Sequence, residues 1–177
     1  PRDITANYLA TLKSWDETES QNRLTKLEQI IDPGLRKTAS DSARLSWSTD
    51  ETKVLYTDKE GNFKLSDLSL KKNYDLPKAA NFEFLPDSKH LVMVETVEGS
   101  PAPKPSGSPA PQTIKDRFAQ TRISIIEIDG TNKAEIYYGL VEPKIVVPWP
   151  DGSRLVVISS LPTLTASEPN LYGINLK

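Results

Sequence analysis

Between about residue 43 and the C-terminus, hydrophobic and polar residues alternate in short stretches that turn-forming residues separate. In residues 63–68, 123–128 and 171–176, apolar side chains recur at roughly every second position. This period of two places them on one face of an extended chain, as in half-buried β-strands. The pattern therefore predicts a succession of short strands.

The clearest pair of strands lies in residues 146–158, on either side of Pro150-Asp151-Gly152. Proline presets φ for the first corner of a turn, aspartate can accept hydrogen bonds from nearby backbone N–H groups, and glycine tolerates a positive φ. Two strands joined by such a turn run antiparallel. We therefore expect a β-hairpin here.

Weaker copies of this hairpin occur upstream, in residues 47–56 and 84–94, where Asp50 and Asp87 hold the place of the turn aspartate. The aspartates are about 37 and about 64 residues apart, and removing a proline-rich insertion of roughly two dozen residues brings the longer interval to about 40. A repeat of about 40 residues built from short strands is typical of β-propeller blades, each a four-stranded antiparallel sheet.

Residues 43–177 resemble TolB-like and related WD-type propeller repeats, most clearly at residues 150–154 and 128–132. The C-terminal part also resembles the propeller regions of PEGA-domain envelope proteins of uncultured bacteria, through residues 129–132 and 170–176. The resemblance implies a propeller on the cell-envelope or extracellular side. No PEGA domain itself is visible in the sequence.

The expected fold class is all-β: a propeller fragment or an undersized propeller of about three to four blades. A chain of 177 residues holds at most about four blades, whereas closed propellers usually have four to eight. Residues 43–177 would form the blades, the last with three strands. The chain begins at Pro1 without an initiator methionine, as a processed or excised part of a longer protein would.

The N-terminal segment, residues 1–42, has two interpretations. Residues 7–12 are similar to residues 170–176, which favours strands of a terminal blade that could complete the last sheet. Alternatively, residues 14–17 resemble a capping box, and apolar residues follow at helical spacing, which favours an amphipathic helix near residues 15–31. A short helical turn at residues 27–31, ended by Pro33 and Gly34, fits either interpretation. Of the two interpretations, we prefer the strand.

In residues 99–113 proline alternates with small residues. Such a segment cannot pair in a β-ladder and has little apolar bulk, so we expect a long loop inserted between two strands of the second blade. A polyproline ligand for an aromatic groove of a partner is the alternative.

The net charge is −2, and charges of both signs are interspersed, which disfavours nucleic-acid binding. No apolar run is long enough to span a membrane and no signal peptide is present, so direct membrane insertion is not expected. The chain has no cysteine, which excludes disulfides and thiolate chemistry.

The sequence offers no catalytic, metal-binding or cofactor-binding set of residues. His90 is the only histidine, and no Gly-x-Ser-x-Gly elbow accompanies it. The acidic stretches at residues 58–62 and 129–132 are better explained as hairpin turns than as calcium loops. Trp47 and Trp149 lie beside the repeated turns, where packing between blades is the simplest role, and Trp15 could be exposed.

The expected function is therefore that of a non-enzymatic binding or scaffold module, which presents loops on one propeller face to a protein partner. Self-association that completes a ring, most simply as a dimer, is a second expectation. The alternative is an accessory propeller domain of a larger hydrolase of the prolyl-oligopeptidase kind. Neither a cofactor nor a metal is expected.

The turn assignment predicts that Gly152→Val destabilises the third hairpin. A β-branched residue resists a positive φ, and the left-handed region costs an ordinary residue roughly 1–2 kcal/mol. Chemical denaturation should show this loss in the free energy of unfolding. Equal values for the variant and the parent would contradict the assignment.

Overall fold

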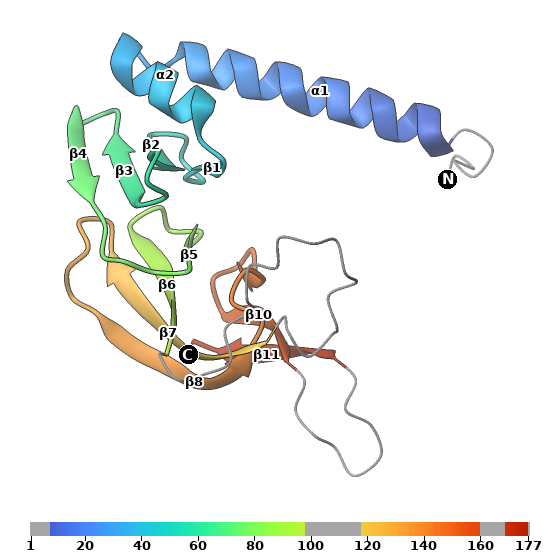
Figure 1. Ribbon diagram of the computed structural model, residues 1–177, viewed down its shortest axis with the longest axis vertical. Helices are drawn as coiled ribbons and strands as arrows, with labels where there is room; N and C mark the ends of the chain where they lie inside the picture. Colours follow the sequence, from blue (N-terminus) through green and yellow to red (C-terminus); the bar gives the residue numbers. More distant parts are fainter. Residues whose placement is uncertain (1–7, 98–117, 160–168, 177) are drawn as a thin grey trace. The chain divides into compact units, whose positions relative to one another are not determined.

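The computed structural model describes residues 8–97, 118–159 and 169–176 (Figure 1). The chain divides into two compact units, Pro1–Ala43 and Arg44–Lys177, and each is described by itself. The proline-rich insertion expected at residues 99–113 lies outside the described residues. Neither described helix has both the length and the apolar character needed to cross a membrane.

The first unit holds a long helix, α1 (Tyr8–Glu28). Lys13 and Glu17 form an ion pair one turn apart, with 3.8 Å between nitrogen and oxygen. The Thr18 hydroxyl donates to the carbonyl oxygen of Ser14, which is how a threonine is accommodated within a helix. Trp15 is exposed on this helix, as expected.

A second helix, α2 (Pro33–Asp41), follows after a short connection. Asp32 caps it, because its carboxylate accepts a hydrogen bond of 2.9 Å from the backbone N–H of Leu35. Pro33 occupies the first turn, where no intrahelical N–H is needed. The Arg36 side chain donates to the carbonyl oxygen of Ile30 and so ties α2 to the connection before it.

The strand interpretation of the N-terminal segment is therefore wrong, and this segment supplies no strand from Tyr8 to Glu28 to complete the last blade. The capping box is wrong as well, because α1 begins before Ser14. Pro33 opens α2 instead of ending a helix. The physical reason is that residues 8–28 contain four leucines, three glutamates and two lysines, which lose little freedom in a helix.

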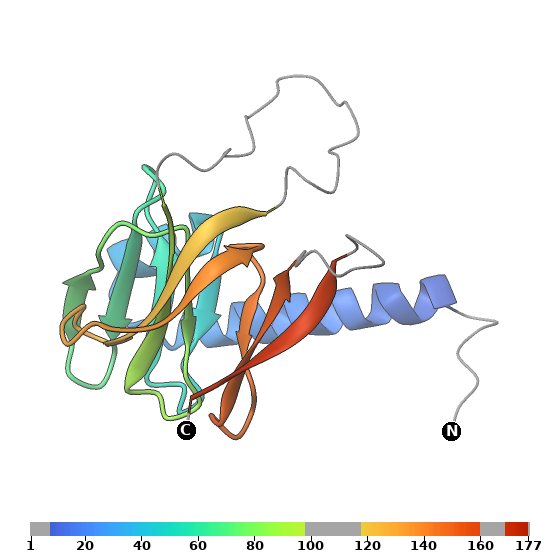
Figure 2. The ribbon, with the colours of Figure 1, turned by 90° about the horizontal axis from the view of Figure 1, so that it is seen from below.

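The second unit consists of three antiparallel sheets, which are the expected blades (Figures 1 and 2). The first two sheets have four strands each, and the third has three among the described residues. Blade 1 contains β1 (Leu45–Trp47), β2 (Lys53–Thr57), β3 (Phe63–Asp67) and β4 (Lys72–Asp75); blade 2 contains β5 (Asn81–Phe84), β6 (His90–Thr96), β7 (Ala119–Glu127) and β8 (Ala134–Val141); blade 3 contains β9 (Val146–Pro148), β10 (Arg154–Ser159) and β11 (Asn170–Asn175).

Each blade runs from an inner strand outwards in chain order: β1-β2-β3-β4, β5-β6-β7-β8 and β9-β10-β11. The propeller-blade architecture is confirmed for this unit, including the three strands of the last blade. The expected β class is confirmed, and the two described helices lie in the N-terminal unit.

Two apolar cores lie between successive blades. In the core between blades 1 and 2, Leu55 and Leu65 of blade 1 meet Leu91 and Met93 of blade 2. The Phe63 and Phe82 rings add an edge-to-face contact with their centroids 5.2 Å apart. The core between blades 2 and 3 joins residues of β6 and β7 to residues of β9 and β10, namely Val92, Val94, Ile123, Val146, Leu155 and Val157.

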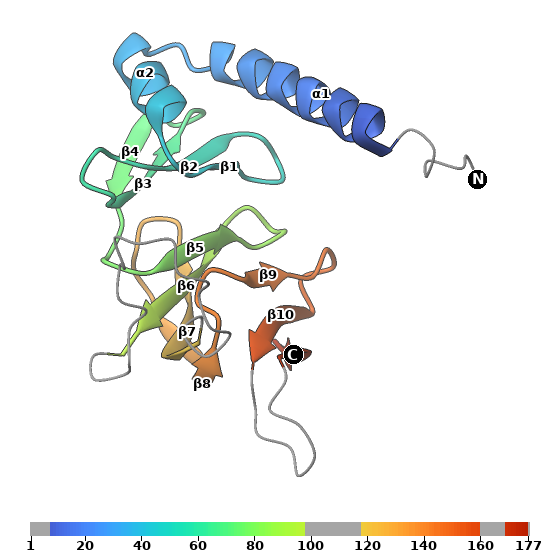
Figure 3. The ribbon, with the colours of Figure 1, turned by 45° about the vertical axis from the view of Figure 1, so that its right-hand side comes forward.

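Alternating side chains of the middle strand of blade 2 therefore enter different cores. Leu91 and Met93 of β6 pack towards blade 1, whereas Val92 and Val94 pack towards blade 3. We call the side of a blade that faces the next blade in the chain its forward face, and the opposite side its backward face. Figure 3 shows the inner strands β5 and β9 of adjacent blades side by side.

The three repeated turns share one backbone conformation. Glu51, Ser88 and Gly152 occupy the same place in the three turns and have φ values of 56°, 57° and 69°. In each turn their N–H donates to the carbonyl oxygen three residues earlier, at 2.9, 3.0 and 2.8 Å. Two of the three turns thus hold an ordinary residue in the left-handed region.

Glu51→Gly should therefore raise the free energy of unfolding. Glycine removes a cost of roughly 1–2 kcal/mol in the left-handed region. Its greater freedom in the unfolded chain lowers this gain by about 0.4–1 kcal/mol. We therefore expect a net gain of about 0.5–1 kcal/mol. Chemical denaturation would measure it. Ser88→Gly is the matched control and should gain less, because the Ser88 hydroxyl makes a hydrogen bond that glycine cannot make.

Candidate functional site: the row of repeated turns

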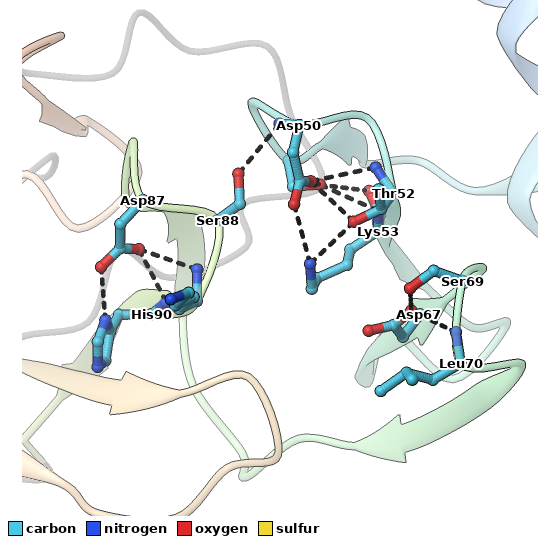
Figure 4. A network of polar contacts seen from close by, with 11 residues as sticks. Asp50, Thr52, Lys53, Asp67, Ser69, Leu70, Asp87, Ser88 and His90 are labelled. Carbon is cyan, nitrogen blue, oxygen red and sulfur yellow. Dashed lines mark hydrogen bonds and ion pairs between the residues drawn. The ribbon is translucent and has the colours of Figure 1, made fainter.

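The three repeated turns lie in a row across adjacent blades. The backbone N–H of Asp50 in blade 1 donates to the Ser88 hydroxyl of blade 2 over 3.0 Å (Figure 4). At the next junction, a Cβ built on Gly152 of blade 3 would lie 3.9 Å from the Pro86 ring of blade 2. The first two turns are therefore joined by a hydrogen bond, and the third lies close to the second. We call residues 48–53, 85–90 and 149–154 together the turn row.

One aspartate organises each turn of the row. The Oδ1 atoms of Asp50, Asp87 and Asp151 accept hydrogen bonds from the backbone N–H two residues later, at 3.1, 2.9 and 2.8 Å. This is the hydrogen bond that makes aspartate a turn residue. The role that the sequence predicts for these aspartates is confirmed.

Asp50 has the most partners in Figure 4. Its carboxylate accepts hydrogen bonds from the Ser48 and Thr52 hydroxyls and from Lys53 Nζ, the last at 3.2 Å. Burial alone would raise the pKa of this carboxyl, but the hydrogen bonds from Ser48, Thr52 and Lys53 outweigh it and lower the pKa well below its usual range.

His90 begins the apolar strand β6, where the sequence places it. Its Nδ1 lies 2.6 Å from Asp87 Oδ2. Burial tends to raise the pKa of the Asp87 carboxyl, but hydrogen bonds from the His90 side chain and from the backbone N–H groups of Lys89 and His90 lower it overall. The hydrogen bonds between Asp87 and residues 89 and 90 hold the turn closed.

Each turn carboxylate is thus engaged by its own turn, which makes it a poor general base or metal ligand. Within the part of the chain that the structure describes, no three histidine, aspartate or glutamate side chains could together hold a metal ion. What the turn row offers is a set of exposed side chains, such as Glu51 and Lys89, on a backbone fixed by hydrogen bonds. This arrangement suits contact with another molecule.

A polar cluster joins the inner strands. Asn81 of β5 is fully buried, and its side chain accepts a hydrogen bond from Arg44 and donates to the carbonyl oxygen of Lys144, which lies just before β9. Glu83 lies 3.9 Å from Arg44, and burial raises the pKa of its carboxyl despite that neighbour. Sequence reasoning missed this cluster, because nothing in the local pattern shows that residues 44, 81 and 144 meet.

A surface hollow of about 310 Å³ lies beside blade 1 and is lined by residues 60–64 and 75–79. Lys64 Nζ lies 2.7 Å from Asp75 and 3.8 Å from Asp58, so its charge is already paired. The hydrogen bond to Asp75 raises the pKa of Lys64. Lys64 is therefore not an activated nucleophile or base.

Trp149 differs from the prediction that it packs between blades. Trp149 is half exposed, with the Arg154 guanidinium 5.9 Å from its ring centroid. Trp47 is half-buried in β1. The hydrogen bonds of the turns align Trp149 with Ser48 and Leu85, so Trp47 and Trp149 are not equivalent positions.

Comparison with protein-family models and with curated proteins finds no match for this chain. Solved structures that are similar include TolB from Acinetobacter baumannii (TM-score 0.49, 17% identity, covering 75% of this chain and 29% of that one). A second is an acylaminoacyl peptidase in complex with Z-Gly-Gly-Phe-chloromethyl ketone (TM-score 0.48, 15% identity, 77% and 24%). A third is the β-propeller domain of the Trilobed protease from Pyrococcus furiosus (TM-score 0.45, 14% identity, 76% and 41%).

The chain thus spans less than half the length of each of these proteins. At such identities the similarity concerns the fold alone, which the three sheets of this chain establish by themselves. The resemblance to PEGA-domain proteins has no support among these structures and stays a prediction.

The lowered pKa values in the turn row predict a specific sensitivity to acid. The carboxyl pKa of an ordinary aspartate is 3.8, and the pKa values of Asp50 and Asp87 are both lower than this in the folded chain. Their stabilising effect is therefore fully present above that pH and is lost as the pH falls through the folded values.

Asp50→Asn keeps the Oδ1 acceptor but removes the charge, so its melting temperature should fall less steeply than that of the parent between about pH 5 and pH 2. Thermal unfolding across this range would measure the difference. Asp16→Asn, on the exposed side of α1, is the charge-matched control. Parallel pH profiles for Asp50→Asn and the parent would contradict the role given to the Asp50 charge.

Proposed function

We propose that this protein is a non-enzymatic binding or scaffold module whose turn row contacts a protein partner. The observation that carries the proposal is the hydrogen bond from the Asp50 N–H to the Ser88 hydroxyl. It joins turns of two blades into one surface, so side chains 37 or more residues apart in sequence are presented together.

Rigidity supports this role. Association costs less entropy when the contact residues are already ordered, and here the three turns are closed by aspartate hydrogen bonds over β-sheet supports. The exposed side chains carry both signs, with Glu51 and Asp87 beside Lys89. Mixed charge of this kind favours a partner of complementary polarity over a polyanion such as nucleic acid.

Two other functional expectations stay predictions. An accessory propeller domain of a larger hydrolase is compatible with the fold, but no described residue favours it over a scaffold. Association of two copies into a dimer is likewise untested. The engagement of the turn carboxylates with their own turns supports the proposal that the chain has no catalytic activity.

A photo-crosslinking amino acid placed at Lys89 would test the binding role. Lys59 is the matched control, because it is also an exposed lysine in a hairpin turn but lies outside the turn row. We expect position 89 to form a discrete covalent adduct with a protein partner in extracts of the native host, at least severalfold more than position 59. Excess unlabelled chain should compete with this adduct.

Equal labelling from both positions, or adducts that unlabelled chain does not reduce, would overturn the turn row as the binding surface. Measuring the thermal unfolding of both labelled proteins ensures that a missing adduct is not a folding defect.

A further inference from the structure

The forward face of blade 3 carries apolar side chains that none of the other described strands covers. Val147 is 53% exposed and Leu171 is 70% exposed, while Val156 and Ile158 between them are half-buried. The register places all four on one side of the sheet, since Val156 pairs with Val147 and Ile158 pairs with Leu171. The half-exposed Trp149 extends this surface at one end.

The equivalent residues of the other two blades are buried. The repeat aligns Val156 and Ile158 of β10 with Leu55 and Thr57 of blade 1 and with Val92 and Val94 of blade 2, and those four are at most 7% exposed. Phe63 and Ile123, which pair with Thr57 and Val94, hold the place of Leu171 and are also buried. Each of these forward faces packs against the backward face of the next blade.

Trp149 is likewise exposed where its equivalent in another blade is buried. Its equivalent in blade 2 is Leu85, which is 7% exposed and lies in the core between blades 2 and 3. Gly173 pairs with Val156 on this face, at the place where Leu65 pairs with Leu55 in blade 1. Glycine places no side chain here, and a Cβ built on Gly173 would lie 3.8 Å from the Arg154 side chain.

We propose that the forward face of blade 3 is a docking surface for a further propeller blade, one formed by residues outside these 177. The partner chemistry follows from the two observed junctions: an antiparallel sheet whose inner and middle strands present aliphatic or aromatic side chains, as Phe82, Leu91 and Met93 do towards blade 1. This inference is independent of the binding role of the turn row.

A second copy of the chain fits this surface less well. The backward faces of blades 2 and 3 are already buried against the preceding blade, with Leu91, Met93, Leu155 and Val157 at most 2% exposed. A second copy can therefore offer neither of these two faces.

The absence of cysteine from the sequence allows a direct test. Leu171→Cys places one thiol on the forward face, and Leu70→Cys, at a residue 67% exposed, is the control. Each variant is made in the chain alone and in a fusion in which a flexible linker and a second, cysteine-free copy of residues 79–177 follow Lys177. The appended copy supplies one new backward face.

We expect the thiol at position 171 to react with a maleimide at least tenfold more slowly in the fusion than in the chain alone. The thiol at position 70 should react equally in both. Equal rates at position 171 in a fusion whose circular dichroism shows both copies folded would overturn the proposal. Slow reaction in the chain alone, with a mass near twice 19.7 kDa by light scattering, would also overturn it by assigning the face to a second copy.

A second measurement does not need the fusion. Ile158 and Val94 are equivalent positions, and an uncovered forward face predicts that Ile158→Lys shifts the melting temperature of the chain by no more than about 2 °C. Val94→Lys, at a fully buried residue, should prevent cooperative unfolding near the parent temperature. Equal damage from both substitutions would show that the face is already covered in the chain alone, and the proposal would fail.

Discussion

Burial on both sides of the middle strands is the constraint on which the second unit depends. All five residues of β2 are buried, and β6 sends Leu91 and Met93 into one core and Val92 and Val94 into another. A sheet of this kind cannot face water on either side without exposing aliphatic area, at roughly 25 cal/mol per Å². Blade 2 accordingly has a neighbour on each face, and the exposed forward face of blade 3 differs from it in this respect.

The turns meet a second requirement, which is to reverse the chain within a few residues at the same end of every inner strand. Aspartate supplies an acceptor for the turn N–H, and the following residue takes a positive φ whether or not it is glycine. At Ser88 the strained position also gains a contact, because its hydroxyl accepts the Asp50 N–H of the preceding blade. The same residues thus close each hairpin and align adjacent blades, which leaves a stiff surface and no unoccupied carboxylate in the three turns.

The two surfaces that we assign differ in polarity and in the kind of contact that they suit. The turn row is polar and preorganised, as a surface for reversible contact with a protein would be. The forward face of blade 3 is apolar and equivalent to two buried interfaces, as a surface for permanent packing would be. The fold by itself does not choose between functions.

Local patterns in the sequence were sufficient for the strands, the hairpin turns and the three-stranded last blade, because period-two alternation and Asp-containing turns act over a few residues. They were not sufficient for the N-terminal segment, where a short likeness to residues 170–176 suggested a strand although the helix-forming composition of residues 8–28 prevailed. Only the tertiary structure decided that Arg44, Asn81 and the Lys144 carbonyl meet, that Trp149 is half exposed, and that one blade face lacks a cover. These features depend on which blades are adjacent, and adjacency is set by packing between residues far apart in the chain.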